Sequence, residues 1–425
     1  MMNNEDKIVV NDNLVLHRVK KSNEFTGIKI VDNKINIFVP QVFRYDKKTF
    51  HKDILLFLKS ISLAETVNKE FLNKGKNNIK NVWPFESYLW IIKDYIENDF
   101  YYNREKTYSN KGGKIEWKKT IKNTPIYSNG NLIYDKFVTS KMSATNDIIA
   151  QIYRLCLKQS IEKIGWLFNL NFKVDVQQLI SKKEMIHKVK QAINNTYDDV
   201  KRIRYNHMLK ILKETEGESI LSNSYMYGIE NYYYVYEKMI DMYFDGIKDN
   251  KKNYNPNGYW QLNNKKATIA SSLRPDTIVK QNGITYIIDA KMYQYGVTHD
   301  IIDLPETQSI QKQISYGDYV MNVLHETDVR NAFILPFNKE LVEFKNDPNI
   351  IYFNNDELGY IGYAYVDWRK ESKYEYVHDK IHTFVIDFNY LLRQYKKDNK
   401  KLIGEMCDLF EKITKDEGAD EREYN

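Results

Sequence analysis

Apolar residues recur along the chain with two different spacings, and the change between them separates strand-like regions from helical ones. Up to about residue 48 the spacing predicts short strands, among them 25–31 and 34–42, joined at Asp32-Asn33. Apolar residues three and four positions apart then predict amphipathic helices. These helices span 51–71, 85–100, 146–168, 177–193 and 197–214, with a strand-like stretch at 125–138 before the third.

After about residue 220, helical and strand-like patterns alternate, which is typical of an α/β domain. Two extended runs flank Lys280–Gly283 and predict a β-hairpin, because Asn-Gly is a strong hairpin signal. A polar, turn-rich loop is expected before it, at 248–264. The remaining elements expected here are helices at 230–247, 306–324 and 389–413, and strands at 331–337, 350–353, 358–366 and 383–386.

These patterns predict three regions along the 425 residues, a length that suits two or three domains with separate cores. Residues 1–139 form an α+β region. Residues 140–220 form a mostly helical middle region. Residues 221–425 form an α/β domain with a mixed central sheet flanked by helices.

Composition narrows the class of protein. A hydrophobic content of 42% with mixed charges indicates a folded, soluble chain, and a net charge of +6 suits a polyanionic partner better than an acidic one. Only Cys156 and Cys407 are present, which argues against a disulfide framework or a cysteine-rich zinc site. The polar N-terminus resembles no signal peptide and no stretch is apolar enough to span a membrane, so we expect a cytoplasmic protein.

The predicted hairpin carries the clearest candidate chemistry. Asp276 precedes its first strand, whereas Asp289 and Lys291 end its second strand and point to the same face. Two adjacent carboxylates form the hard oxygen site that Mg²⁺ prefers, and a neighbouring ammonium can position or deprotonate water or stabilise developing charge. The alternative is a surface hairpin with a simple Asp–Lys ion pair. The apolar run before Asp289 favours the metal site.

The order Pro-Asp, then Asp-x-Lys after a hairpin turn, resembles the PD-(D/E)xK nuclease superfamily. The resemblance implies a restriction-endonuclease-like core in the C-terminal domain. It also implies a glutamate on the preceding helix as a further metal ligand, for which Glu237 is the best candidate and Glu230 the second. Gln313 corresponds to a polar residue that faces the site from the following helix. The alternatives are a solvated helix carboxylate for Glu237 and a core glutamine bonded to backbone for Gln313.

A basic segment at 103–123 contains aromatic residues and a Gly-Gly pair, a composition that suits contact with a phosphate backbone. A solvated linker is the alternative. The contact interpretation makes the N-terminal region a candidate for DNA recognition. Its candidate DNA-binding residues are Lys111, Lys114, Trp117, Lys118, Lys119 and Lys122.

Beyond this motif, the chain is similar to the LlaJI family of restriction endonucleases, which are related to McrC nuclease subunits. The similarity is carried by residues 114–134, 234–240, 274–293 and 304–319. It implies a type II-like deoxyribonuclease that cleaves double-stranded DNA with Mg²⁺ in defence against foreign DNA. Asp276, Asp289 and Lys291 match the catalytic positions of the family, and Glu237 and Gln313 match auxiliary positions.

Two alternative functions stay open at this point. The first is a McrC-like nuclease subunit that cuts only with a partner NTPase of the AAA+ class, since the chain has no P-loop of its own. The second is a DNA-binding module that does not cleave, against which the intact acidic and lysine positions argue. For an enzyme that cuts two strands, we expect a homodimer.

Overall fold

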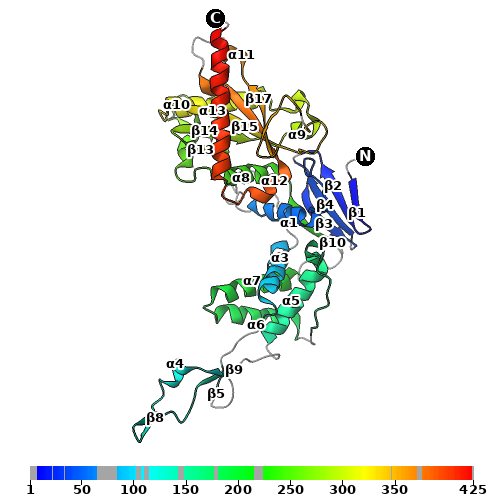
Figure 1. Ribbon diagram of the computed structural model, residues 1–425, viewed down its shortest axis with the longest axis vertical. Coiled ribbons are helices and arrows are strands. Elements are labelled where there is room, and N and C mark those ends of the chain that lie inside the picture. The colour runs from blue at the N-terminus through cyan, green and yellow to red at the C-terminus, as the bar shows by residue number, and fades with distance from the viewer. Residues whose placement is uncertain are drawn as a thin grey trace. The chain divides into compact units, whose positions relative to one another are not determined.

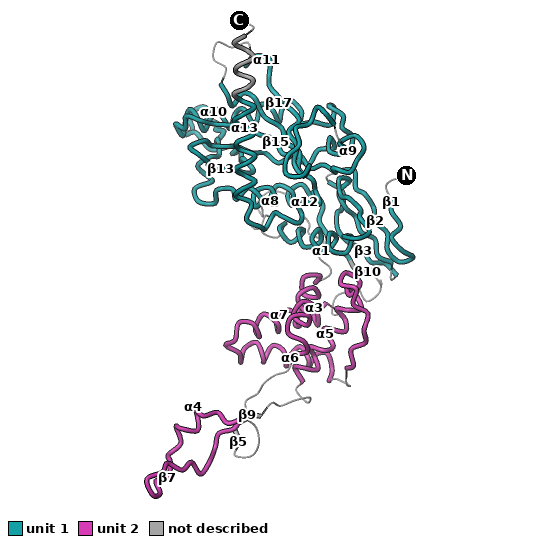
Figure 2. Tube along the Cα trace, in the orientation of Figure 1, with its two compact units in different colours: residues 1–80, 225–425 teal, residues 81–224 magenta. Residues whose placement is uncertain are grey.

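The computed structural model describes residues 7–21, 23–32, 34–64, 84–101, 107–109, 114–141, 148–176, 180–214, 224–345, 347–370 and 376–423. The chain divides into two compact units, one of Met1–Lys80 with Tyr225–Asn425 and the other of Asn81–Ser224 (Figure 2). The boundary predicted near residue 220 lies close to this division, whereas the one predicted at 139–140 lies inside the second unit. In the part of the chain described, no helix has the length and apolar character needed to cross a membrane.

A mixed six-stranded sheet forms the centre of the first unit, with strand order β13-β14-β15-β18-β17-β16 (Figure 1). Its central pairs β14–β15 and β15–β18 are parallel, and the pairs at both sides are antiparallel. The strands are β13 (Thr277–Gln281), β14 (Ile284–Ala290), β15 (Val329–Phe337), β16 (Ile351–Phe353), β17 (Leu358–Ala364) and β18 (Ile381–Asp387). The expected α/β domain with a mixed sheet and flanking helices is therefore present.

The turn between β13 and β14 shows why the sequence folds into a hairpin here. Asn282 has φ 54° and Gly283 has φ 82°, so both central residues are left-handed. A two-residue turn of this kind matches the natural twist of the flanking strands, and Asn-Gly adopts it at low cost. Gln281 pairs with Ile284 directly across the turn, which fixes the register of the whole ribbon.

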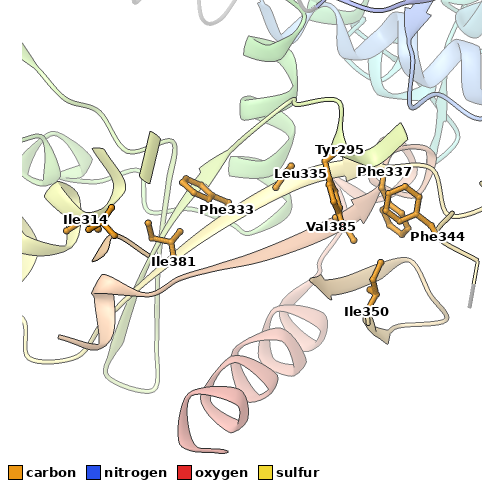
Figure 3. Packing of buried hydrophobic residues seen from close by; sticks show 10 residues of the cluster. Tyr295, Ile314, Phe333, Leu335, Phe337, Phe344, Ile350, Ile381 and Val385 are labelled. Atoms are coloured by element: carbon orange, nitrogen blue, oxygen red, sulfur yellow. The ribbon is translucent and has the colours of Figure 1, made fainter. Parts of the chain in front are cut away.

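Helices cover both faces of this sheet. On one face α13 (Lys400–Glu423) packs Phe410 against Tyr286 of β14 and Phe384 of β18. On the other face lie α8 (Tyr233–Tyr243) and α10 (Thr307–Asn322). Ile314 of α10 belongs to the same buried cluster as Phe333 of β15, and Figure 3 shows this cluster along the strands. Short helices α9 (Tyr295–Thr298), α11 (Asp367–Lys370) and α12 (Phe388–Gln394) complete the flanks.

The N-terminal residues form a second sheet in the same unit, with order β1-β2-β4-β3-β10. Its strands are β1 (Lys7–Asn11), β2 (Leu14–Val19), β3 (Thr26–Val31), β4 (Lys34–Pro40) and β10 (Ser224–Ile229). Strands β3 and β10 approach so closely that a Cβ on Gly27 would lie 2.3 Å from the carbonyl oxygen of Tyr227. Only glycine is tolerated at such a contact.

Polar contacts join the N-terminal segment to the end of the central sheet. The Arg44 main chain exchanges two hydrogen bonds with the Asn389 side chain, at 2.9 and 3.0 Å. Asp53 of α1 (Phe50–Ser60) is buried and accepts a hydrogen bond from Arg393 Nε at 2.8 Å. These contacts explain why residues far apart in the sequence form one unit.

The second unit, considered by itself, is mostly helical. Its helices are α3 (Phe85–Asn98), α4 (Trp117–Thr120), α5 (Ile148–Ile164), α6 (Lys182–Asn194) and α7 (Asp199–Glu214). Short strands form a three-stranded sheet and a hairpin: β5 (Thr107–Ser109), β6 (Lys114–Ile115) and β9 (Thr139–Lys141), then β7 (Ile126–Ser128) and β8 (Asn131–Ile133). A buried ion pair between Arg204 and Asp94, 2.7 Å apart, connects α7 to α3.

Three expected elements differ from the structure. The single C-terminal helix predicted at 389–413 is two helices, because the buried side chain of Asn399 donates to Tyr243 O and Gln394 O and so stabilises a break. The loop predicted at 248–264 contains a strand, β11 (Asn257–Trp260), which pairs with β12 (Thr268–Ser272). The predicted helix at 51–71 ends at Ser60, and its residues after 64 lie outside the described part of the chain.

Candidate active site

The hairpin brings two carboxylates together at the open end of its ladder. Thr277 of β13 pairs with Ile288 of β14, so the next position places Asp276 opposite Asp289. Residues directly opposite each other have Cβ atoms about 5 Å apart. The Asp276 carboxylate accepts a hydrogen bond from the Ala290 main-chain N–H at 2.9 Å, which holds it against the second strand. The backbone therefore positions both acidic side chains.

Asp289 is more deeply buried than Asp276, with 1% of its surface exposed. Neither of its carboxylate oxygens has a hydrogen-bond partner at a favourable angle, although the Lys291 ammonium lies 2.5 Å from Oδ2. Burial opposes its ionisation, but the nearby Asp276 carboxyl and the charge of Lys291 outweigh burial and lower the pKa of Asp289. Asp289 is thus an ionised carboxylate whose oxygens can accept further bonds.

Asp276 has the opposite electrostatic character. Burial raises its pKa well above the usual value, and the neighbouring charges of Asp289 and Glu237 raise it further. Two carboxylates this close cannot both ionise cheaply without a cation. Asp276 therefore retains its proton to higher pH than Asp289 does.

Lys291 follows β14 directly, and its main-chain N–H donates to Ile334 O at 2.9 Å, which continues the pairing with β15. Burial by itself would lower the pKa of its ammonium group. The charges of Asp289 and Asp276 outweigh that effect and raise the pKa above its usual value. Lys291 is accordingly a cation at neutral pH.

Glu237 of α8 lies in the electrostatic field of the same site. Burial, and next the charge of Asp289, raise the pKa of Glu237 to about 7, although Lys291 and other lysines oppose the shift. This shift does not fit the alternative of an ordinary solvated helix carboxylate. Among the described residues, however, Glu237, Asp276 and Asp289 do not bring three ligand atoms within 4.8 Å of one another. Glu237 therefore lies near Asp276 and Asp289, but the three carboxylates do not form a compact group of ligand atoms.

Gln313 and its neighbour Lys312 occupy different positions on α10. Gln313 is fully buried, and its amide donates to Ile287 O at 2.7 Å and to Asn331 Oδ1 at 3.3 Å. These bonds match the second interpretation of Gln313, a core glutamine bonded to backbone. They also hold β14 in place at Ile287, two residues before Asp289. Lys312 instead directs its ammonium group toward Asp289 Oδ1, 4.0 Å away. Lys312 was missed from the sequence.

The site therefore contains three acidic groups and two lysines at one end of a buried hairpin, next to a helix. A family model described as LlaJI restriction endonuclease matches residues 25–361. The chain belongs to the LlaJI restriction endonuclease family. No curated protein matches it. Membership indicates a restriction nuclease, a class of enzyme that acts on DNA.

The matched region of this LlaJI-family chain includes the hairpin, Glu237 and Lys312, as well as the predicted DNA-binding segment. Lys111 lies outside the described residues. In the second unit, the side chains of Lys114, Lys118, Lys119 and Lys122 are exposed, and so is Trp117, whose ring meets Phe137 edge-on at 6.0 Å. Their contact with DNA stays a prediction.

Lys251 is a further residue that sequence reasoning missed. Its ammonium group donates to Asp241 Oδ1 of α8 at 3.0 Å and to the main-chain carbonyl oxygen of Asp276 at 2.5 Å. It lies in the stretch predicted to be a loop, where no local pattern indicates a partner. This lysine connects the helix that carries Glu237 to the residue before β13.

A second group of ionisable residues of this LlaJI-family chain lies near the other end of α10. In the described chain, Asp318, His378 and Asp379 bring three candidate ligand atoms within 4.8 Å of one another. Arg369 already lies between the two carboxylates, ion-paired with Asp318 and 3.8 Å from Asp379 Oδ1. The guanidinium group supplies the positive charge that a metal would otherwise bring, so we interpret the group as an ion-pair network.

Proposed function

We propose that this chain is a Mg²⁺-dependent endonuclease that hydrolyses phosphodiester bonds of double-stranded DNA, as a type II-like restriction enzyme in defence against foreign DNA. The observation that carries the proposal is the pair Asp276 and Asp289 at the end of the β13–β14 hairpin, with Lys291 2.5 Å from the second carboxylate. The hairpin, the helix α10 and the parallel strand β15 follow in the order of a PD-(D/E)xK core, which supports the assignment.

The residues present fit a hard divalent cation. Neither buried oxygen of Asp289 has a hydrogen-bond partner at a favourable angle, and Asp276 supplies a second carboxylate directly opposite. Carboxylate oxygens are the protein ligands that Mg²⁺ prefers, with its remaining positions left to water and phosphate. Asp276 and Asp289 would hold the ion, with Glu237 as a third carboxylate nearby. When bound, Mg²⁺ lowers the pKa of water and neutralises charge on the phosphoryl oxygens.

The charges around Lys291 favour an electrostatic role over that of a general base. A general base must lose its proton near the working pH, whereas in the metal-free protein Asp289 and Asp276 raise the pKa of Lys291. Its role in the proposal is therefore electrostatic: the ammonium group orients the attacking water and stabilises the negative charge that develops on phosphorus oxygens. Lys312 adds a second positive charge to the same side of Asp289.

The test is cleavage of supercoiled and linear plasmid by the purified protein with Mg²⁺, followed by sequencing of the ends. Asp276→Asn, Asp289→Asn and Lys291→Ala should each abolish cutting. Lys280→Ala provides a matched control, because this lysine lies on the same hairpin but pairs with Glu326 at 2.6 Å. The control should cut like the wild type, and circular dichroism should show all four variants folded.

Two results would overturn the proposal in different ways. If the wild type binds DNA but does not cut with any divalent metal, with or without partners, the chain is a DNA-binding module. If it cuts only after a partner NTPase of the AAA+ class and nucleotide are added, it is a nuclease subunit rather than an independent enzyme. A homodimer with one site for each strand is the assembly that we propose for double-strand cleavage, and its test is light scattering on DNA.

A further inference from the structure

A two-stranded ribbon stands directly before the candidate active site. Strands β11 and β12 pair only with each other in the described chain, with Tyr259 opposite Ile269 and Trp260 opposite Thr268. The base of the ribbon is closed by Leu273 N–H, which donates to Pro256 O at 2.9 Å. Asp276 follows three residues later, so the ribbon is joined to the catalytic carboxylate by a very short segment.

Every residue from 257 to 271 is exposed. Among them are large apolar side chains, which a protein surface without a partner seldom carries. Trp260 is 70% exposed and Tyr259 59% exposed, and Leu262 and Ile269 are also uncovered. An isolated two-stranded hairpin is only marginally stable in water, and clustered apolar side chains commonly mark a surface that binds a partner.

Charge identifies the chemistry of that partner. From Asn250 to Pro275 the sequence contains five basic residues and no Asp or Glu, although the whole chain has 57 acidic residues in 425. Lys251 is engaged inside the site, but Lys265 and Lys266 lie exposed in the turn between the two strands. A stretch that is positive and free of carboxylates suits a polyanion better than a protein surface of mixed charge.

We propose that the β11–β12 ribbon is a DNA-contacting element that enters a groove of the duplex next to the cleavage site. This inference rests on the proposed nuclease function and describes how the enzyme holds its DNA substrate. A two-stranded ribbon fits the major groove of B-form DNA. Lys265 and Lys266 contact the phosphate backbone, whereas Tyr259 and Ile269, which lie opposite each other on one face of the ribbon, contact base edges. The lysines therefore position the duplex and the strands select sequence.

The test measures binding of the full chain to a fluorescent 30-base-pair duplex, about three helical turns, without divalent metal and over a series of salt concentrations. Lys265→Glu with Lys266→Glu should weaken binding at least about tenfold and reduce the slope of log affinity against log salt by about two. Lys400→Glu with Lys401→Glu is the matched control, since these adjacent, exposed lysines on α13 undergo the same change of charge. The DNA affinity of this control variant should stay within about twofold of the wild-type affinity.

Tyr259→Ala should change which DNA sequences are bound or cut while leaving the salt dependence unchanged, and Tyr259→Phe should restore part of the preference. Equal DNA binding and cleavage by the wild type and both ribbon variants would overturn the inference while leaving the nuclease proposal intact. A change of oligomeric state without a change in DNA affinity would also overturn it, because the ribbon would then be a protein interface. Loss of cleavage by Asp289→Asn with binding unchanged tests the nuclease proposal separately.

Discussion

The ammonium group of Lys251 donates a hydrogen bond to the main-chain carbonyl oxygen of Asp276 at 2.5 Å. The same group is anchored by Asp241 of α8, at 3.0 Å, so Lys251 connects this helix to the start of β13. The carbonyl belongs to a residue whose side chain is a proposed metal ligand. A lysine outside the motif therefore helps to set the position of a carboxylate inside it.

Lys251→Met is expected to slow cleavage at saturating DNA by about one to two orders of magnitude, because a small displacement of a catalytic group is costly. Asp241 keeps its contact with Lys238 at 3.1 Å, so the fold should persist. Lys251→Arg should recover part of the rate, which a purely structural defect would not do. Lys248→Met is the control, since Lys248 is exposed and pairs with Asp245 at the surface. Equal rates for Lys251→Met and this control would contradict the positioning role.

Glu237 gives a pH dependence of stability whose sign follows from its raised pKa. Its pKa rises from 4.5 in the unfolded chain to about 7 in the metal-free protein, mainly through burial. The native state then binds more protons than the unfolded state between these values, so the free energy of unfolding falls as pH rises through this window. Glu237→Gln should remove this loss and be more stable than wild type above pH 7 by on the order of 2 kcal/mol.

Urea unfolding with a chelator, at intervals from pH 4.5 to 8, measures this difference. The two proteins should converge toward the acidic end, because Glu237 is then protonated in both states. Mg²⁺ should narrow the gap at high pH, since a nearby cation favours ionised carboxylates. Parallel curves over the whole pH range would show that Glu237 is not perturbed as described.

The hairpin could be predicted because its signals are local. Asn282 and Gly283 specify the turn, and the alternation of side chains then places Asp289 and Lys291 on one face. The pairing of Asp276 with Asp289 follows from that register alone. Most helices of both units were also predicted within a few residues, since each has an apolar stripe.

What the sequence did not reveal depends on packing between distant segments. Lys312 approaches Asp289 only because α10 crosses the sheet beside β14, and no spacing in the sequence encodes that distance. In the same way, β10 joins the N-terminal sheet after a separation of about 190 residues, so the first 80 residues belong to the unit of the candidate site. Gln313 shows a different limit of the sequence, because a polar residue inside an apolar stripe can serve the backbone as well as a site.

The contact between α1 and α12 predicts that the N-terminal segment stabilises the unit that contains the site. Arg393→Ala would leave the buried carboxylate of Asp53 without its ion pair, which typically costs about 3–5 kcal/mol. Lys401→Ala removes an exposed pair with Glu405 and should change stability by less than about 0.5 kcal/mol. Denaturant unfolding of the full chain compares the two. Similar stabilities would mean that the N-terminal segment contributes little.

Lys312 provides a prediction that separates metal binding from catalysis. Its ammonium group lies 4.0 Å from Asp289 Oδ1, where it competes with a cation for the same carboxylate. Lys312→Ala should therefore bind divalent metal more tightly in calorimetric titration, because a repulsive charge has been removed. The same variant should cleave DNA about 10- to 100-fold more slowly, because a charge that stabilises the developing negative phosphoryl group is lost. Gln311→Ala, at the exposed neighbouring position on α10, should change neither quantity. Weaker metal binding by Lys312→Ala would show instead that the lysine supports the fold of the site, since only a structural defect would lower both affinity and rate.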